Sequence, residues 1–147
     1  MNKCLRIAPF LPILIIWSGS LAVDWTCYRP LPDYRSTQTR DVIEQQVDIH
    51  WDTHGVPHIY AGNKKDLYYA LGYVHAQDRL WQMTLSQMAA EGRFAEFLGK
   101  DLLPYDKLQR TLGFWNIAQQ IAPTLSDSTQ DLLQAYSAGV NSYVKHN

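Results

Sequence analysis

The sequence predicts an α+β fold, in which a hairpin of two strands is followed by three or four helices. Apolar and polar residues alternate from Val47 to Trp51, which is the period of a half-buried strand. From Lys64 onward, apolar residues instead recur at spacings of three and four, as on one face of a helix. The chain has 147 residues, is 46% hydrophobic and carries a formal net charge of -1. This composition is typical of a folded domain and excludes the basic footprint of a nucleic-acid-binding protein.

The predicted hairpin extends from Val47 to Ala61. Thr53, His54 and Gly55 supply its turn, and Gly55 can adopt the positive φ that such turns use. Pro57 has no N–H to donate to a strand ladder, so we expect it at the first position of the second strand or on an edge.

A long helix is predicted from Lys64, with Asn63 as its N-cap. Asp66 lies in the first turn, where a carboxylate favours the positive end of the helix dipole. Gly72 indicates a close approach by another helix. The apolar face of this helix is predicted to contain Leu67, Ala70, Leu71 and Val74.

The helical pattern is interrupted at Gly92, resumes from Phe94 to Leu98 and ends at Gly99. Asp101 to Pro104 is predicted to connect this helix to the next one. A single helix is then expected from Tyr105 to Ala122, closed by Pro123. Its apolar positions are Leu108, Leu112, Trp115 and Ile117.

Ser126 is expected to cap the last helix. The apolar stripe predicted for that helix consists of Leu132, Leu133, Tyr136, Val140 and Tyr143.

Residues 1–23 have the character of a targeting segment. Lys3 and Arg6 precede the apolar run from Ile7 to Trp17, and small residues around Ala22 suit signal peptidase. The run is short for a bilayer-spanning helix, so both a signal peptide cleaved after Ala22 and a retained membrane anchor fit it. Either one predicts an exported, periplasmic or otherwise extracytoplasmic protein. Residues 24–46, which contain two prolines, are expected to form an extended linker.

Three histidines invite a test for a metal site. His50, His54 and His58 recur at every fourth position, a spacing that would place three imidazoles on one face of a helix. Gly55 and Pro57 interrupt this segment and its flanks alternate as strands do. We therefore assign no metal ligands and regard a histidine metal-binding protein as a weak alternative.

A dense polar cluster, His75 to Arg79, interrupts the apolar pattern of the long helix. One interpretation makes His75 and Asp78 an acid–base pair. The other is a buried or half-buried structural network in which Arg79 pairs with a carboxylate and Gln77 bonds a backbone group. We favour the structural interpretation because no candidate nucleophile accompanies the cluster, and we assign no catalytic and no cofactor-binding residue.

Four blocks, taken together, resemble the opening of the penicillin amidase (penicillin acylase) family. The most specific block runs from Gly72 to Met83, and the resemblance covers roughly Val47 to Tyr143. We therefore expect residues 47–147 to be a partial α-chain region of this family. One departure is the run from Leu85 to Ala89, where the family often has an arginine pair. The blocks are DTHGVPHIYA (Asp52 to Ala61), DLYYALGYVHAQDRLWQM (Asp66 to Met83), GRFAEFLG (Gly92 to Gly99) and LLQAYSAGVNSY (Leu132 to Tyr143).

The resemblance implies an N-terminal nucleophile hydrolase with a four-layer αββα core. Such precursors are cut into an α chain and a β chain, and the first residue of the β chain, usually Ser, attacks an amide carbonyl. Its free α-amino group has a pKa near neutrality and accepts the hydroxyl proton. Substrates in the family are penicillins, other N-acyl compounds and acyl-homoserine lactones, which links the activity to antibiotic biosynthesis or modification.

The resemblance also implies partners for this chain. These are the rest of the α chain, the β chain with the nucleophile and, in the intact enzyme, a small N-acyl substrate. We expect the chain alone to be inactive and to hold no cofactor, because the calcium ligands of some family members lie beyond the matched blocks. The alternative is a non-catalytic, membrane-tethered helical binding module that is stable without a partner.

Overall fold

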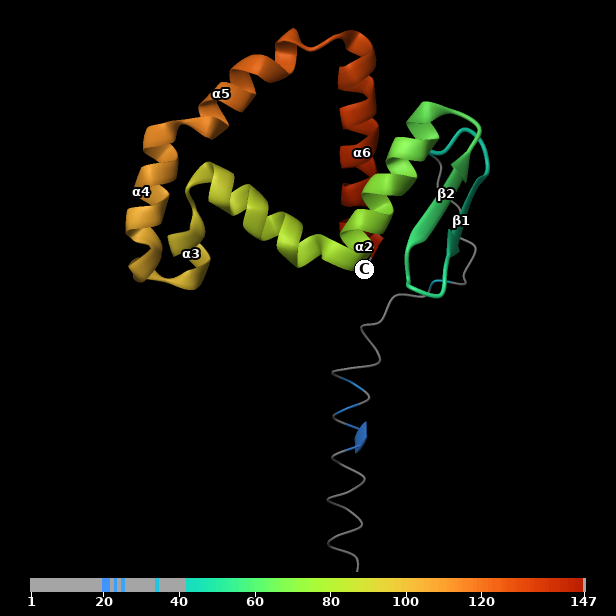
Figure 1. Cartoon of the computed structure of the whole chain (residues 1–147), viewed down its shortest axis with the longest axis horizontal. Coiled ribbons are helices and arrows are strands. Elements are labelled where there is room, and N and C mark those ends of the chain that lie inside the picture. Colours follow the sequence, from blue (N-terminus) through green and yellow to red (C-terminus); the bar gives the residue numbers. More distant parts are fainter. Residues whose placement is uncertain (1–19, 22, 24, 26–33, 35–41, 147) are drawn as a thin grey trace, which may run out of the picture. The chain divides into compact units, whose positions relative to one another are not determined.

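The computed structural model describes residues 20, 21, 23, 25, 34 and 42–146 (Figure 1). The chain divides into two compact units, residues 1–38 and residues 39–147, and the fold below is that of the second unit. Most of the expected signal or anchor segment and of the expected linker lies outside the described residues. Within the described part of the chain, none of the helices has the length and apolarity needed to cross a bilayer.

The predicted hairpin is confirmed. Strand β1 (Val47–Trp51) pairs in antiparallel fashion with β2 (Pro57–Ala61), so that Trp51 lies opposite Pro57. Alternate residues of both strands are half-buried, as the sequence pattern predicts. The turn is closed by the Asp52 carboxylate, which accepts the N–H groups of His54 at 2.8 Å and Val56 at 2.9 Å.

Helix α2 (Lys64–Glu91) begins at the predicted cap, because the Asn63 side chain accepts the N–H of Asp66 at 2.8 Å. The helix is kinked at Arg79, whose φ of -136° and ψ of 19° are not helical. After the kink, the Thr84 hydroxyl donates to the Leu80 carbonyl at 2.9 Å, a contact that often accompanies bent helices. Figure 1 shows the first half of α2 beside β2 and α6, and the second half turning away towards α3.

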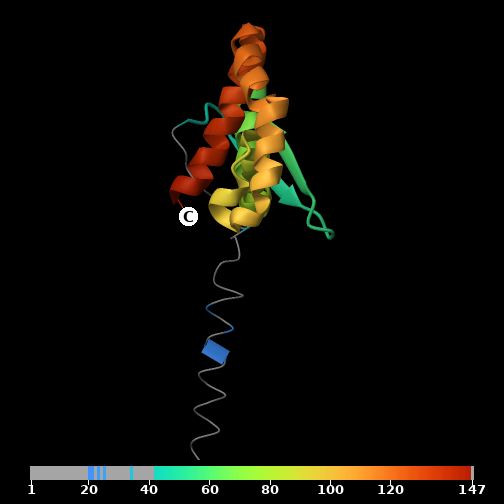
Figure 2. The ribbon, with the colours of Figure 1, turned by 90° about the vertical axis from the view of Figure 1, so that its left-hand side faces the viewer.

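Helix α6 (Asp127–His146) crosses the first half of α2 at very short range. Figure 2 shows the ribbon from a second direction, with α6 in red. A Cβ atom at Gly72 would overlap the carbonyl group of Tyr136. A Cβ atom at Gly139 would overlap the carbonyl group of Tyr69. The close approach predicted at Gly72 is therefore confirmed. The buried apolar side chains around this crossing are Tyr69, Ala70, Val74, Ala76 and Ala135.

Helix α2 ends at Gly92, which has a φ of 65°. The chain then forms α3 (Phe94–Leu98), the 3-10 turn η4 (Lys100–Leu102) and α4 (Leu103–Leu112). The connection predicted for Asp101 to Pro104 is thus a 3-10 turn followed directly by α4. Pro104 lies within α4 because proline is tolerated in the first turn of a helix.

The prediction of one helix from Tyr105 to Ala122 is wrong. The structure has two helices, α4 and α5 (Phe114–Ile121), followed by the 3-10 turn η5 (Ala122–Thr124). Gly113 separates them with a φ of 71°, a left-handed conformation that a right-handed helix cannot contain.

The last helix begins as predicted, since Ser126 Oγ accepts the N–H of Thr129 at 3.3 Å. Its apolar stripe is mostly confirmed, because Leu132, Tyr136, Val140 and Tyr143 are half-buried. Leu133 is instead exposed. The closest packing is made by the small residues Ala135 and Gly139, because only small residues let two helix backbones approach so closely.

Candidate functional site

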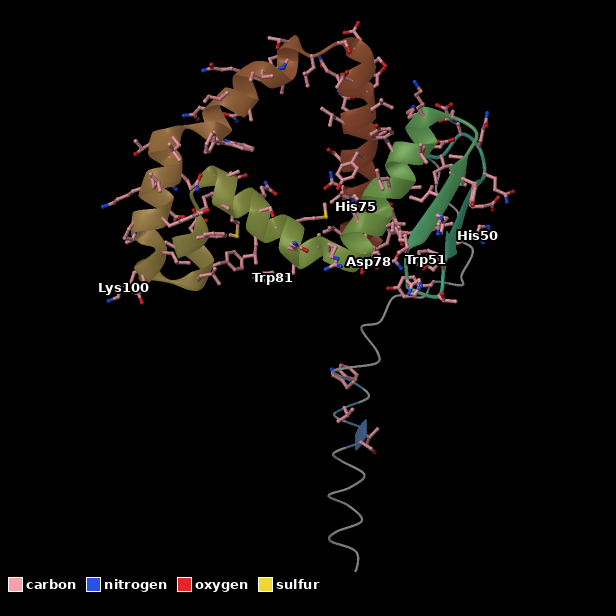
Figure 3. All side chains as sticks on the ribbon, viewed as in Figure 1. His50, Trp51, His75, Asp78, Trp81 and Lys100 are labelled. Atoms are coloured by element: carbon pink, nitrogen blue, oxygen red, sulfur yellow. The ribbon has the colours of Figure 1, made fainter. Side chains whose placement is uncertain are left out.

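His75, in the predicted polar cluster, has a specific partner on another helix. Its side chain lies on α2, and its Nδ1 atom is 3.0 Å from the Tyr136 hydroxyl on α6. The two rings meet edge-on with centroids 5.8 Å apart. Either group can be the donor of this hydrogen bond, which connects α2 to α6. Figure 3 shows His75 on α2, close to α6.

The remainder of the cluster differs from the predicted network. His75, Asp78 and Arg79 are all exposed, and Gln77 is half-buried. Arg79 lies at the kink of α2 and is exposed, and the described residues include no ion pair of its guanidinium. The predicted carboxylate partner of Arg79 is therefore not found among the described residues, whereas Gln77 is half-buried as expected.

Asp78 lies within electrostatic reach of a tyrosine at the α2–α6 crossing. Burial, the neighbouring Tyr73 and the charge of Asp78 together raise the pKa of Tyr143 above its ordinary value. The rings of Tyr73 and Tyr143 meet edge-on, with centroids 5.5 Å apart. The crossing thus carries aromatic and hydrogen-bonding contacts, which suit the packing of two helices rather than the activation of a nucleophile.

The three hairpin histidines do not share one helix face. His50 lies opposite His58 across the two strands, and His54 lies in the turn. The His50 ring packs edge-on against Tyr60, whereas His58 Nε2 approaches an Asp52 carboxylate oxygen at 3.6 Å. Among residues 42–146 and the few described before them, no three His, Cys, Asp or Glu side chains converge as metal ligands would.

Asp66 has a larger role than its predicted effect on the helix dipole. Its side chain is 1% exposed, and its carboxylate accepts the N–H of Glu44 at 3.1 Å, the N–H of Gln45 at 2.9 Å and the Asn63 amide at 2.7 Å. Burial acts to raise the pKa of this carboxyl, but the donated hydrogen bonds prevail and hold that pKa below its ordinary value. Asp66 therefore fastens the segment before β1 to the start of α2.

Asp106 does the same at the other end of the fold. Its side chain is 5% exposed and accepts the N–H groups of Phe94 and Ala95, both at 2.8 Å. These are free N–H groups of the first turn of α3, so a carboxylate from α4 caps a helix that has no side-chain cap of its own. Arg110 Nε also donates to the Gly92 carbonyl at 2.9 Å. Sequence reasoning missed Asp106 because it caps from the following helix.

The third polar centre joins α2 to α3. Arg93 donates to Glu91 at 2.7 Å and to Glu96 at 2.8 Å, and these contacts lower the pKa values of both glutamates. Gln87 also donates to Glu91 at 2.8 Å. This amide contact lies in the Leu85 to Ala89 run, where the sequence departs from the family pattern.

Comparison with known proteins shows which family this chain resembles. The sequence profile of the penicillin amidase family matches residues 46–147. Penicillin acylase 2 proenzyme of Pseudomonas sp. (strain SE83) is 40% identical over 114 residues, which are 78% of this chain and 15% of that protein. Penicillin G acylase of Escherichia coli is 42% identical over 101 residues, which are 67% of this chain and 12% of that protein.

Acyl-homoserine lactone acylases are also similar. The acylase QuiP of Pseudomonas aeruginosa is 36% identical over 114 residues, which are 78% of this chain and 14% of that protein. The chain therefore spans only 12% to 15% of the length of these relatives.

A solved structure shares the fold as well as the sequence. The thermostable penicillin G acylase from Alcaligenes faecalis superimposes with a TM-score of 0.62 at 34% identity, over 69% of this chain and 54% of that chain. The resemblance inferred from the four sequence blocks is thus confirmed, and the hairpin followed by helices is a part of the acylase fold. The chain belongs to the penicillin amidase family.

Proposed function

We propose that this chain is the N-terminal scaffold of an amidohydrolase that cleaves linear, non-peptide amide bonds of N-acyl compounds such as penicillins. The observation that carries the proposal is the match of residues 46–147 to the penicillin amidase profile, supported by the superposition on a penicillin G acylase. The named relatives include acylases of penicillins and of acyl-homoserine lactones, so both classes are candidate substrates. A role in antibiotic biosynthesis or modification follows from the first class.

The chemistry is assigned to polypeptide outside the matched region. In the mechanism that the family resemblance implies, a terminal hydroxyl attacks the acyl carbon and its own α-amino group takes the proton. Backbone donors then stabilise the oxyanion, and water releases the acyl group. The described carboxylates support a scaffold role, because Asp52, Asp66 and Asp106 each use their oxygens to hold backbone N–H groups.

Export is part of the proposal. The charged head and apolar run of residues 1–23 would carry the scaffold out of the cytoplasm, either as a cleaved signal peptide or as a retained anchor. Mass spectrometry of the mature N-terminus distinguishes the two, because cleavage after Ala22 leaves Val23 as the first residue.

The activity is tested with a chromogenic phenylacetyl amide, with penicillin G and with an acyl-homoserine lactone. The purified chain is expected to hydrolyse none of them. The chain co-expressed with the remainder of Penicillin acylase 2 of Pseudomonas, from which the matching segment has been removed, is expected to hydrolyse at least one. Turnover by the chain alone, or no turnover by a complex that forms, would contradict the proposal.

A further inference from the structure

Helix α5 has an apolar face that the described part of the chain leaves open. Residues 114, 117, 118 and 121 follow the i, i+3, i+4, i+7 spacing of a single helical stripe, which we call the α5 face (Phe114, Ile117, Ala118 and Ile121). The three large side chains are 55%, 48% and 51% exposed in that order. An amphipathic helix of a folded protein normally buries this stripe, so the exposure indicates a missing neighbour.

The neighbouring helix contributes a second open stripe. Leu108 and Leu112 lie on one side of α4 and are both about half exposed. The other side of α4 is already used, because Asp106 and Arg110 bind the backbone around α3 and Gly92. The side of α4 that binds this backbone is therefore not the side that carries the two leucines. Figure 1 shows α4 and α5 on the side of the fold away from the hairpin.

The composition of residues 111–126 indicates what kind of surface would cover the α5 face. Residues 111–126 contain no Asp, Glu, Lys or Arg. The polar side of α5 consists of uncharged amides, including Asn116 and Gln119. Helices that lie on anionic membranes carry Lys and Arg on their polar face, so this composition argues against a lipid surface. It fits instead the interior of a larger protein, where depletion of charge accompanies permanent contact.

We propose that the α5 face, with the adjoining Leu108 and Leu112, is the surface on which this chain docks onto the remaining polypeptide of the acylase. The inference rests on the proposed function. It commits to this occupant because the chain spans only 12% to 15% of the length of its relatives, so most of an acylase lies beyond the matched region. If these aliphatic side chains are buried in the assembled acylase, their exposure in this chain by itself is explained.

The test uses the full chain co-expressed with the remainder of Penicillin acylase 2 of Pseudomonas, which carries an affinity tag. The interface variant is the double substitution Ile117→Ser and Ile121→Ser. The matched control on the opposite side of the same helix is Asn116→Ser and Gln119→Ser. Circular dichroism of each purified chain must show unchanged helix content, as expected for substitutions at exposed positions.

The wild-type chain and the control are expected to co-purify with the remainder in equal amounts. The interface variant is expected to bind about 100-fold more weakly, since two buried isoleucines are replaced by hydroxyls and each loss corresponds to about tenfold in affinity. Unchanged binding by the interface variant would overturn the inference while leaving the proposed function intact. Failure of the wild-type chain to bind would overturn both.

Two other occupants are distinguished by the same proteins. Sedimentation of the chain alone would reveal a second copy of the chain as the occupant if wild type formed dimers and the interface variant did not. Co-sedimentation with vesicles of phosphatidylcholine and phosphatidylglycerol would reveal a lipid surface. Either result, if abolished by the Ile117→Ser and Ile121→Ser substitutions, overturns the proposed docking onto the acylase polypeptide.

Discussion

Two buried carboxylates organise this fold by binding backbone N–H groups rather than cationic side chains. Asp66 holds Glu44 and Gln45 before the hairpin, and Asp106 holds Phe94 and Ala95 at the start of α3. A charged acceptor makes stronger hydrogen bonds than a neutral one, and its burial is tolerated because its oxygens are satisfied. Removal of either carboxylate should therefore loosen a specific segment of backbone.

For Asp66→Asn we expect the free energy of unfolding to fall by about 2 kcal/mol, because the amide offers one neutral oxygen where the carboxylate offered two charged ones. Urea denaturation of the chain followed by circular dichroism measures the change. The exposed Asp48→Asn is the control and should shift the free energy of unfolding by less than about 0.5 kcal/mol. Equal effects of the two substitutions would contradict the role assigned to Asp66.

The same carboxylate predicts a dependence of stability on pH. The folded-state pKa of Asp66 is lowered, so the unfolded chain binds more protons in acid and the stabilisation is lost as pH falls through the folded pKa. The difference in free energy of unfolding between wild type and Asp66→Asn should be constant above about pH 5 and shrink as the pH falls below about 4. Denaturation at a series of pH values provides the measurement, and a difference that grows in acid would refute it.

Sequence reasoning located these residues better than it explained them. Asp66 was expected to act on the helix dipole, yet its partners Glu44 and Gln45 lie 22 and 21 residues upstream, outside any local pattern. The partner of His75 is 61 residues away on α6. Such pairs are set by the packing of helices, which periodicity along one helix does not contain.

At the scale of elements, Asp106 gives a local prediction. In Asp106→Ala the first turn of α3 loses both acceptors for its N–H groups, so α3 should open more often while α2 and α6 stay folded. Hydrogen exchange of the Phe94 and Ala95 amides is expected to accelerate by about tenfold or more, given about 1.5 kcal/mol for a hydrogen bond to a charged group. Asp101→Ala is the control, and uniform acceleration across α2 and α6 would show that the effect is global.

Packing of α2 on α6 gives a second prediction. Replacing a glycine by alanine inside a helix usually stabilises it, but Gly139→Ala should destabilise the chain by about 2 kcal/mol or more, because the added methyl overlaps the Tyr69 carbonyl. The matched control is Ser137→Ala, at an exposed position of the same helix. Thermal unfolding of both variants decides the matter, and a rise in melting temperature for Gly139→Ala would contradict the crossing.

The elements themselves were largely predictable because their signals are local. The hairpin, the Asn63 cap and the Ser126 cap follow from alternation and from side chains next to the helix start. The break between α4 and α5 was missed because apolar spacing continues across Gly113, and spacing does not reveal that a glycine adopts a φ of 71°. The kink at Arg79 was missed for a similar reason, since no proline marks it.

At the scale of the whole molecule, the fold combines a tight centre with an open flank. The α2–α6 crossing brings backbones into contact, whereas the α5 face and the stripe on α4 remain exposed. A fold that lacks a covering layer exposes apolar surface to solvent. The docking proposed above would cover these apolar side chains with another part of the acylase.

The chain alone should therefore bind a hydrophobic dye such as anilinonaphthalene sulfonate. Fluorescence is expected to fall when the chain assembles with the remaining acylase polypeptide, because the α5 face is then covered. The Ile117→Ser and Ile121→Ser variant should show less dye binding, and Asn116→Ser with Gln119→Ser should match wild type. A chain that unfolds cooperatively without any dye binding would favour the alternative of a self-sufficient binding module.

The crossing of α2 and α6 has a consequence for how this lineage can diverge. The atoms that meet at Gly72 and Gly139 belong to peptide groups, and peptide groups are identical in every sequence. At these two points the closest approach of the helices is therefore limited by backbone atoms rather than by side chains. Relatives that retain this geometry are expected to have glycine at both positions, even where most of the intervening sequence differs.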